Sequence, residues 1–90
     1  MQRSRWDIMA RILRVAKSAD SKTHIMYQAN LSHRQLDRYL DLLLDKGLLR
    51  VVAVERHSKP VKFFGTTEKG LSFLEAYRAL EAIVRAGKGA

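Results

Sequence analysis

The sequence contains no cysteine and only one proline among its 90 residues. Without cysteine, neither a disulfide nor a thiolate-bound metal is possible, and this composition suits an intracellular chain. No apolar run reaches the ~18 residues of a membrane-spanning helix, and no secretory signal follows the arginine-rich start. We therefore expect a cytoplasmic protein with one small domain, near the lower size limit for an independent hydrophobic core.

Acidic residues are also scarce, since 17 Lys and Arg residues outnumber 9 Asp and Glu residues and give a net charge of +8. A basic domain with a pI near 10.3 is a candidate for binding nucleic acid, because the phosphate backbone attracts it. Six cations accompany two acids in residues 1–22, and four accompany one in residues 50–66, whereas residues 23–49 are neutral. The positive charge therefore flanks the middle of the chain.

The middle of the chain predicts a capped amphipathic helix over residues 32–46. Ser32 and Gln35 have the spacing of a capping box, with Leu31 and Leu36 placed to form a hydrophobic staple. Gly47 is a strong stop signal. One face of this helix is apolar and carries Leu36, Tyr39, Leu40, Leu43 and Leu44.

The first two turns of this helix carry polar side chains suited to reading DNA. Arginine pairs bidentately with guanine, glutamine pairs with adenine, and serine binds phosphate. Asp41 and Asp45 farther along would repel phosphate, so only the start of the helix is expected to enter a groove. An ordinary solvated helix face explains the same pattern equally well. The candidate base-reading residues are Ser32, His33, Arg34, Gln35 and Arg38.

Two further helices are predicted before this one. Ser4 is placed to cap the first, and Ser21 is placed to cap a short second helix from Lys22 to Ala29. Asn30 tolerates the left-handed conformation that ends a helix. A short helix, a tight turn and a capped amphipathic helix together form a helix-turn-helix pattern.

A β-hairpin is predicted next, from strand-like runs at residues 48–55 and 61–66 joined by about five polar residues. The connection is basic, and a basic hairpin that follows a helix-turn-helix is a wing. We expect the wing to contact phosphate or the adjacent minor groove. The residues that carry this expectation are Arg56, His57, Lys59 and Lys62.

The last helix is predicted over residues 67–86, with a row of apolar side chains beyond those needed to pack on its own domain. The first helix also carries a second apolar row, in addition to the one that faces the core. We predict that these two apolar rows, or seams, build a homodimer interface, although the two seams covering each other within one chain remains an alternative. The interface residues are Trp6, Met9 and Leu13 from the first helix and Phe73, Tyr77, Leu80 and Val84 from the last.

Several stretches together resemble the archaeal winged-helix family, which includes small chromatin-associated proteins and stand-alone transcriptional regulators. They are the run at residues 23–32, Gly47-Leu48 and Thr67-Glu68-Lys69-Gly70. The resemblance implies a mainly α winged helix-turn-helix with a three-helix core, a two-stranded wing and a long C-terminal helix. It also implies double-stranded DNA binding and a homodimer through the last helix. The last helix here is short beside the coiled-coil rods of the chromatin members.

The favoured function is a single DNA-binding domain over residues 1–90, acting on the nucleoid as a homodimeric transcriptional regulator. A sequence-tolerant chromatin protein is the alternative, and a protein-interaction module is a third interpretation, supported by Asp37, Asp41 and Asp45. No enzyme is expected, because the sequence offers no phosphate-binding loop and no nucleophile motif. His24, His33 and His57 lack the spacing of metal ligands, so neither a metal nor a cofactor is expected.

Overall fold

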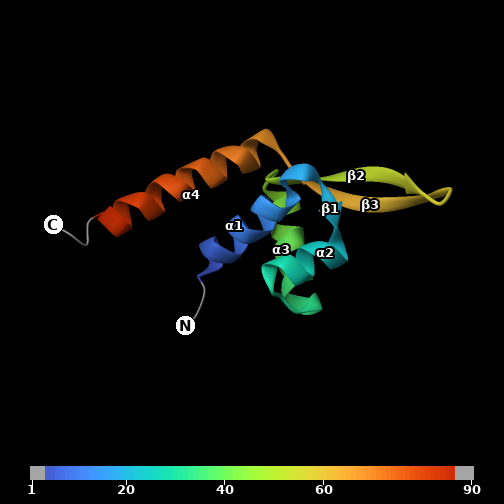
Figure 1. Cartoon of the computed structure of the whole chain (residues 1–90), viewed down its shortest axis with the longest axis horizontal. Helices are drawn as coiled ribbons and strands as arrows, with labels where there is room; N and C mark the ends of the chain where they lie inside the picture. Colours follow the sequence, from blue (N-terminus) through green and yellow to red (C-terminus); the bar gives the residue numbers. More distant parts are fainter. Residues whose placement is uncertain (1–3, 87–90) are drawn as a thin grey trace.

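The computed structural model describes residues 4–86, which form four α-helices, a short 3-10 turn and three strands (Figure 1). In chain order, the elements are α1 (Arg5–Val15), the 3-10 turn (Ala16–Ser18), β1 (Asp20–Ser21), α2 (Lys22–Ala29), α3 (His33–Asp45), β2 (Leu49–Arg56), β3 (Lys59–Thr66) and α4 (Glu68–Ala86).

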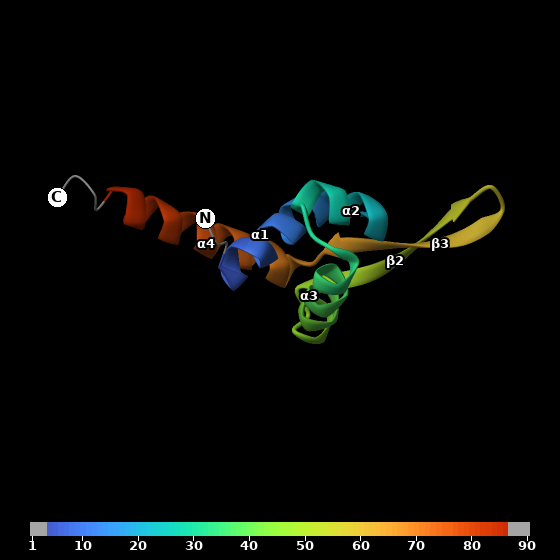
Figure 2. The same cartoon turned by 90° about the horizontal axis from the view of Figure 1, so that it is seen from below.

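The molecule is elongated, with extents of 57 × 27 × 21 Å. In Figures 1 and 2, α4 and the β2–β3 hairpin leave the helical body in opposite directions along the longest axis. α3 runs across that axis and is seen almost end-on in Figure 2. The start of α3 therefore lies apart from α4.

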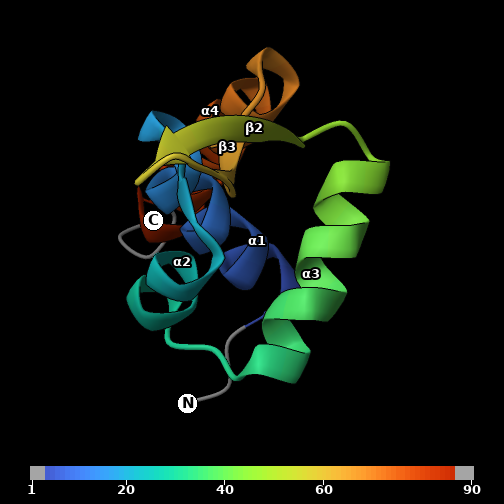
Figure 3. The ribbon, with the colours of Figure 1, turned by 90° about the vertical axis from the view of Figure 1, so that its right-hand side faces the viewer.

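The core is built around α1, which lies between α2 and α3 (Figure 3). Its buried side chains cover a broad side of the helix and leave Arg11 and Arg14 exposed on the other side. The buried residues are Ile8, Met9, Ala10, Ile12 and Leu13. Ile25 of α2 and Leu36 and Leu43 of α3 are fully buried in the same hydrophobic core. The position of α1 corrects the predicted interface at Met9 and Leu13. Met9 is only 4% exposed and Leu13 is fully buried within the single chain, so neither offers surface to a second copy.

The predicted ends of α3 are confirmed. At the start, the Gln35 amide donates to Ser32 Oγ at 3.2 Å, and the Ser32 amide donates to Gln35 Oε1 at 3.0 Å, which completes the capping box. At the end, Gly47 adopts a φ of 73°, and the Leu48 amide donates back to the Leu43 carbonyl at 2.8 Å. This Schellman arrangement satisfies the last carbonyls of the helix. The caps predicted at Ser4 and Ser21 and the left-handed Asn30 are also present.

The sheet has three antiparallel strands in the order β1-β3-β2, one more than the sequence predicted. The additional strand is only two residues long, and it pairs Asp20 with Phe64 and Ser21 with Phe63. Such a short strand has no alternating pattern that sequence reasoning can detect. It fixes the base of the hairpin to the start of α2.

The wing has a tighter tip than predicted. Arg56 and Lys59 face each other in the β2–β3 register, so only His57 and Ser58 connect the strands, and the predicted connection of about five residues is wrong. Both residues have positive φ, 52° and 63°. Two successive left-handed residues form a type I′ turn, whose twist suits paired strands. Lys59 and Lys62 therefore lie on a strand.

The root of α4 is fastened to the end of α3. Thr67 caps α4, since the Gly70 amide donates to its Oγ1 at 3.0 Å, and the Thr67 hydroxyl itself donates to the Gly47 carbonyl at 2.6 Å. A Cβ at Gly70 would lie 2.3 Å from the Leu48 carbonyl oxygen, so only glycine allows this approach. Within residues 4–86 no helix combines the length and the apolar character needed to span a membrane.

Candidate nucleic-acid interface

The polar start of α3 is open to solvent. Ser32, His33, Arg34, Gln35 and Arg38 are all exposed, while Leu36 in the same turns is fully buried. The buried leucine anchors the helix and leaves the five predicted base-reading side chains on its outer surface. The structure thus places these five residues together on one accessible stretch.

Gln35 differs from the other candidates because its side chain already has a structural task. Its Oε1 accepts a hydrogen bond from the Ser32 amide at 3.0 Å. A bidentate contact with adenine needs that oxygen as an acceptor and the amide nitrogen as a donor. The oxygen has a second lone pair, but the cap holds it in place, so Arg34 and Arg38 are the stronger candidates for base recognition.

Asp37 on α3 forms an ion pair with Lys22 of α2, which joins the two helices of the helix-turn-helix. The ion pairs among the described residues are this one, Arg14–Glu81 and His24–Asp20. None of them involves Arg34 or Arg38. Lys22 therefore compensates the charge of Asp37, the acidic residue nearest the first turns of α3. Asp41 and Asp45 lie exposed farther along the helix.

The wing presents its predicted cations on two faces. Because side chains alternate along a strand, Arg56 and Lys59 share one face, and Lys62, paired with Ala53, lies on the other. All are exposed, as is His57 at the tip. The Arg56 guanidinium lies 5.4 Å from the centre of the Phe63 ring, a cation–π contact that orients it. The four residues therefore surround the wing and do not form a single patch.

Hydrogen bonds connect three side chains from β1 along α2. The His24 imidazole bonds the Asp20 carboxylate, and Gln28 Nε2 lies 3.4 Å from His24 Nε2. Partial burial alone would raise the pKa of Asp20. The hydrogen bonds from His24 and from the Ser21 amide, with the charges of His24 and Arg56, outweigh it and hold the pKa below its ordinary value. A charged carboxylate is thus stabilised at the base of the wing.

Sequence reasoning missed two exposed residues near this surface. Tyr27 is 73% exposed on α2, and Arg50 is exposed at the base of β2. The signal for Tyr27 was present, because Ile25 and Ala29 face inward and a residue midway between them faces outward in a helix. Within residues 4–86, no group of three His, Asp or Glu side chains is placed to hold a metal ion.

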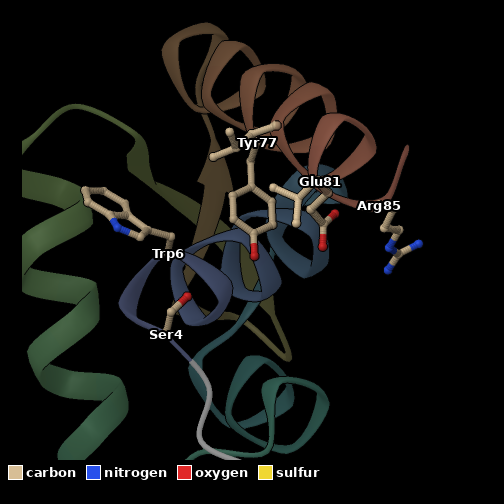
Figure 4. Close-up of a pocket in the computed structure, with 7 residues that line it drawn as sticks. Ser4, Trp6, Tyr77, Glu81 and Arg85 are labelled. Atoms are coloured by element: carbon tan, nitrogen blue, oxygen red, sulfur yellow. The ribbon is translucent and has the colours of Figure 1, made fainter. Parts of the chain in front are cut away.

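The apolar seam of α4 is covered in its N-terminal half and exposed in its C-terminal half. Trp6 of α1 lies with its ring centre 6.4 Å from that of Phe73, and Phe73 stacks on Tyr77 at 6.3 Å. The two predicted seams thus cover each other in part within one chain. Beyond this cluster, Leu80 is 57% exposed and Val84 68% exposed. Figure 4 shows Trp6 and Tyr77 from α1 and α4 beside a groove of about 330 Å³ that Leu80 and Val84 also line.

Comparison with known proteins agrees with this geometry. A family model described as winged helix-turn-helix matches residues 2–85. The chain belongs to this winged helix-turn-helix family. The family resemblance seen in the sequence is therefore confirmed. A curated relative, an uncharacterized protein of Methanocaldococcus jannaschii, is 36% identical over 50 residues, which cover 54% of this chain and 52% of that protein. The matched segment thus spans about half the length of that relative.

Solved structures share the winged-helix architecture. Sso10a-2, a DNA-binding protein from Sulfolobus solfataricus, is 24% identical, with a TM-score of 0.73 over 97% of this chain and 90% of that one. A PadR family transcriptional regulator from Eggerthella lenta is 21% identical, with a TM-score of 0.74 over 91% of this chain and 78% of that one. At these identities the likeness shows the fold: four helices with a small antiparallel sheet.

Proposed function

We propose that this winged-helix protein binds double-stranded DNA and acts as a transcriptional regulator. The observation that carries the proposal is the start of α3, where five polar side chains stay exposed above the fully buried Leu36. In the proposed complex, Arg34 and Arg38 enter the major groove, and Ser32, His33 and Gln35 contact phosphate or base edges at its border. The proposal assigns the protein no catalysis and no cofactor, and it places the protein on the nucleoid.

The wing has a different role in this mechanism. Arg56, His57, Lys59 and Lys62 contact phosphate or the neighbouring minor groove, and these contacts set the orientation of α3 without reading bases. The net charge of +8 supports the same mode of binding, because each neutralised phosphate releases condensed counterions.

The test is a titration of the protein into a labelled mixed-sequence duplex at several salt concentrations. The logarithm of the association constant should fall linearly with the logarithm of salt concentration, with a slope of about −0.9 for each phosphate neutralised. An affinity that stays flat between low and moderate salt would rule out the mechanism. Failure to bind any duplex would instead favour the protein-interaction alternative, for which the exposed Asp41 and Asp45 are the available acids.

We also propose that the protein is a homodimer joined through the exposed half of α4. Its support is the apolar surface of Leu80, Ile83 and Val84, which are 57–68% exposed. Trp6 and Tyr77 line the same groove as Leu80 and Val84, and the Phe73 ring contacts both aromatic rings. A dimer would present two reading helices to a pseudo-palindromic site.

Sedimentation at micromolar concentration tests the dimer. The wild-type chain should sediment as a dimer and Leu80→Lys as a monomer. Leu71→Lys is the matched control, because Leu71 is 43% exposed on α4 but lies off the seam, and this variant should remain dimeric. A wild-type chain that sediments only as a monomer would disprove the dimer.

A chromatin role remains the alternative to regulation. Selection of bound sequences from a random DNA pool separates the two functions. Recovery of one motif would support a regulator, and recovery of none would support a sequence-tolerant coat on the duplex.

A further inference from the structure

We propose that the groove between the ends of α1, α3 and α4 binds a small organic carboxylate with a flat apolar body. The groove has a volume of about 350 Å³, at the small end of the range for small-molecule sites. It shares only Trp6 with the groove that Leu80 and Val84 line. Its lining residues are Arg5, Trp6, Met9, Leu42, Lys46, Leu48, Lys69 and Phe73.

The floor of the groove is apolar and partly aromatic. Trp6 and Phe73 supply two rings whose centres are 6.4 Å apart and whose planes are tilted by 34°. Met9, with its flexible and polarisable thioether, lies between helices beside them. A flat apolar group of a ligand could contact both rings, and rings of this kind are the usual lining of small-molecule pockets.

The rim of the groove is cationic, because each of the three helices contributes one basic side chain. Arg5 comes from the first turn of α1, Lys46 from the end of α3 and Lys69 from the first turn of α4, and all three are exposed. Lys69 Nζ donates one hydrogen bond to the Lys46 carbonyl at 2.7 Å, so two of its three N–H groups remain for a ligand. None of the lining residues is acidic, so a carboxylate would meet three donors and no repelling side chain.

The charge of the rim selects among possible occupants. A second copy of the chain carries a net charge of +8 and would bring more positive charge against these three cations. A nucleic-acid duplex would leave the apolar floor without a partner, because its outer surface is phosphate. An amphipathic monocarboxylate satisfies both parts of the groove, with its apolar body on the rings and its charge at the rim.

The chain offers a direct readout, because Trp6 is its only tryptophan. We would titrate the full-length protein with sodium 4-phenylbutyrate and follow the indole emission. The expected result is a saturable change in emission. The uncharged analogue 4-phenyl-1-butanol, which keeps the apolar body, should bind about tenfold more weakly or worse, since it cannot form charge-assisted hydrogen bonds.

Two double variants test the rim. Lys46→Gln with Lys69→Gln should weaken 4-phenylbutyrate binding by about tenfold or more, as expected for the loss of charged donors. Lys59→Gln with Lys62→Gln removes the same charge from the wing and should leave binding unchanged. If Lys69→Gln impairs folding, Arg5→Gln tests the rim from α1 without the interhelix hydrogen bond. Equal weakening by both double variants would mean only a general attraction of anions to a basic protein and would overturn the proposal.

A second readout locates the probe, because Trp6 also borders the grooves along the α4 seam. Met9 lines the proposed groove, and Met26 of α2 does not. With ¹³C-labelled methionine methyl groups, 4-phenylbutyrate should shift the Met9 resonance and leave that of Met26 in place. No saturable emission change, equal binding of the alcohol, or an unshifted Met9 resonance would each overturn the assignment. None of these measurements depends on DNA binding.

Discussion

Lys22 of α2 and Asp37 of α3 form an ion pair across the helix-turn-helix. Both side chains are about half exposed, so the pair contributes little to stability, in the range of about 0–1 kcal/mol. Its larger effect concerns charge. The pair neutralises a lysine that would otherwise be free to contact phosphate beside the reading turns of α3.

Asp37→Asn should therefore strengthen DNA binding severalfold at low salt. The substitution removes an acid from the interface and releases Lys22, so the salt slope should become steeper by about 0.9, the value for one further phosphate. Asp45→Asn makes the same charge change at the far end of α3 and is the matched control. If the two variants have the same affinity and slope, Lys22 lies outside the DNA contact.

Arg38→Ala and Lys59→Ala should weaken DNA binding in different ways. Loss of Arg38 should cost about 1–3 kcal/mol on a preferred site and relax the sequence preference, because a bidentate base contact is removed. Loss of Lys59 should weaken binding to every sequence alike and reduce the salt slope by about 1. Titrations with a selected site and a scrambled duplex distinguish the two effects. Negligible changes in both variants would dismiss these assignments.

Gly70→Ala should destabilise the fold by about 2 kcal/mol or more, measured by urea unfolding. The new methyl group would lie 2.3 Å from the Leu48 carbonyl oxygen and 2.6 Å from Thr66 Cγ2, and overpacking of this kind typically costs about 1–3 kcal/mol. Intrinsic helix propensity alone predicts the opposite sign, a gain of about 1 kcal/mol. Gly65→Ala is the control, with its nearest contact at 3.4 Å from Val52 Cγ2, and its effect should stay within about 1 kcal/mol. A neutral or stabilising Gly70→Ala would contradict the close approach.

Asp20→Asn should lower stability in a pH-dependent manner. The pKa of Asp20 is lower in the folded protein than its ordinary value of 3.8, so its carboxylate stabilises the fold above that pH. The contribution disappears as the pH falls through the folded-state pKa. Urea unfolding at about pH 5, which lies above the ordinary pKa of an aspartate carboxyl group, should show the variant as less stable. The difference should vanish in stronger acid, and a deficit that stays constant with pH would exclude the electrostatic cause.

Most of the fold could be predicted from the sequence because its signals are local. Ser32 and Gln35 determine a cap within one turn, and Gly47 supplies the positive φ that ends the helix. The two-residue β1 strand could not be predicted, since its position is determined by pairing with distant residues of β3. The tip at His57 and Ser58 also escaped prediction, because neither residue is the Asn or Gly that usually marks a type I′ turn.

The candidate site was predictable where exposure follows from helical periodicity. Leu36 points inward and Arg34 and Arg38 outward on the same helix, as the spacing required. The interface residues Met9 and Leu13 were misplaced for the opposite reason. A helix at the centre of a core is buried on several sides, and periodicity cannot distinguish a second buried side from one that awaits a partner chain.

The contact between Gly70 and Leu48 would also influence the distance between the two α3 helices of the proposed dimer. α4 has 19 residues and is about 28 Å long at 1.5 Å per residue. Its direction is fixed where Gly70 packs closely against the Leu48 carbonyl oxygen. A tilt of about 10° at that point would move the far end by about 5 Å, more than the 3.4 Å step between stacked base pairs. In a dimer joined through α4, the packing at Gly70 would thus determine the spacing of the two DNA half-sites, although Gly70 itself is not a proposed DNA contact.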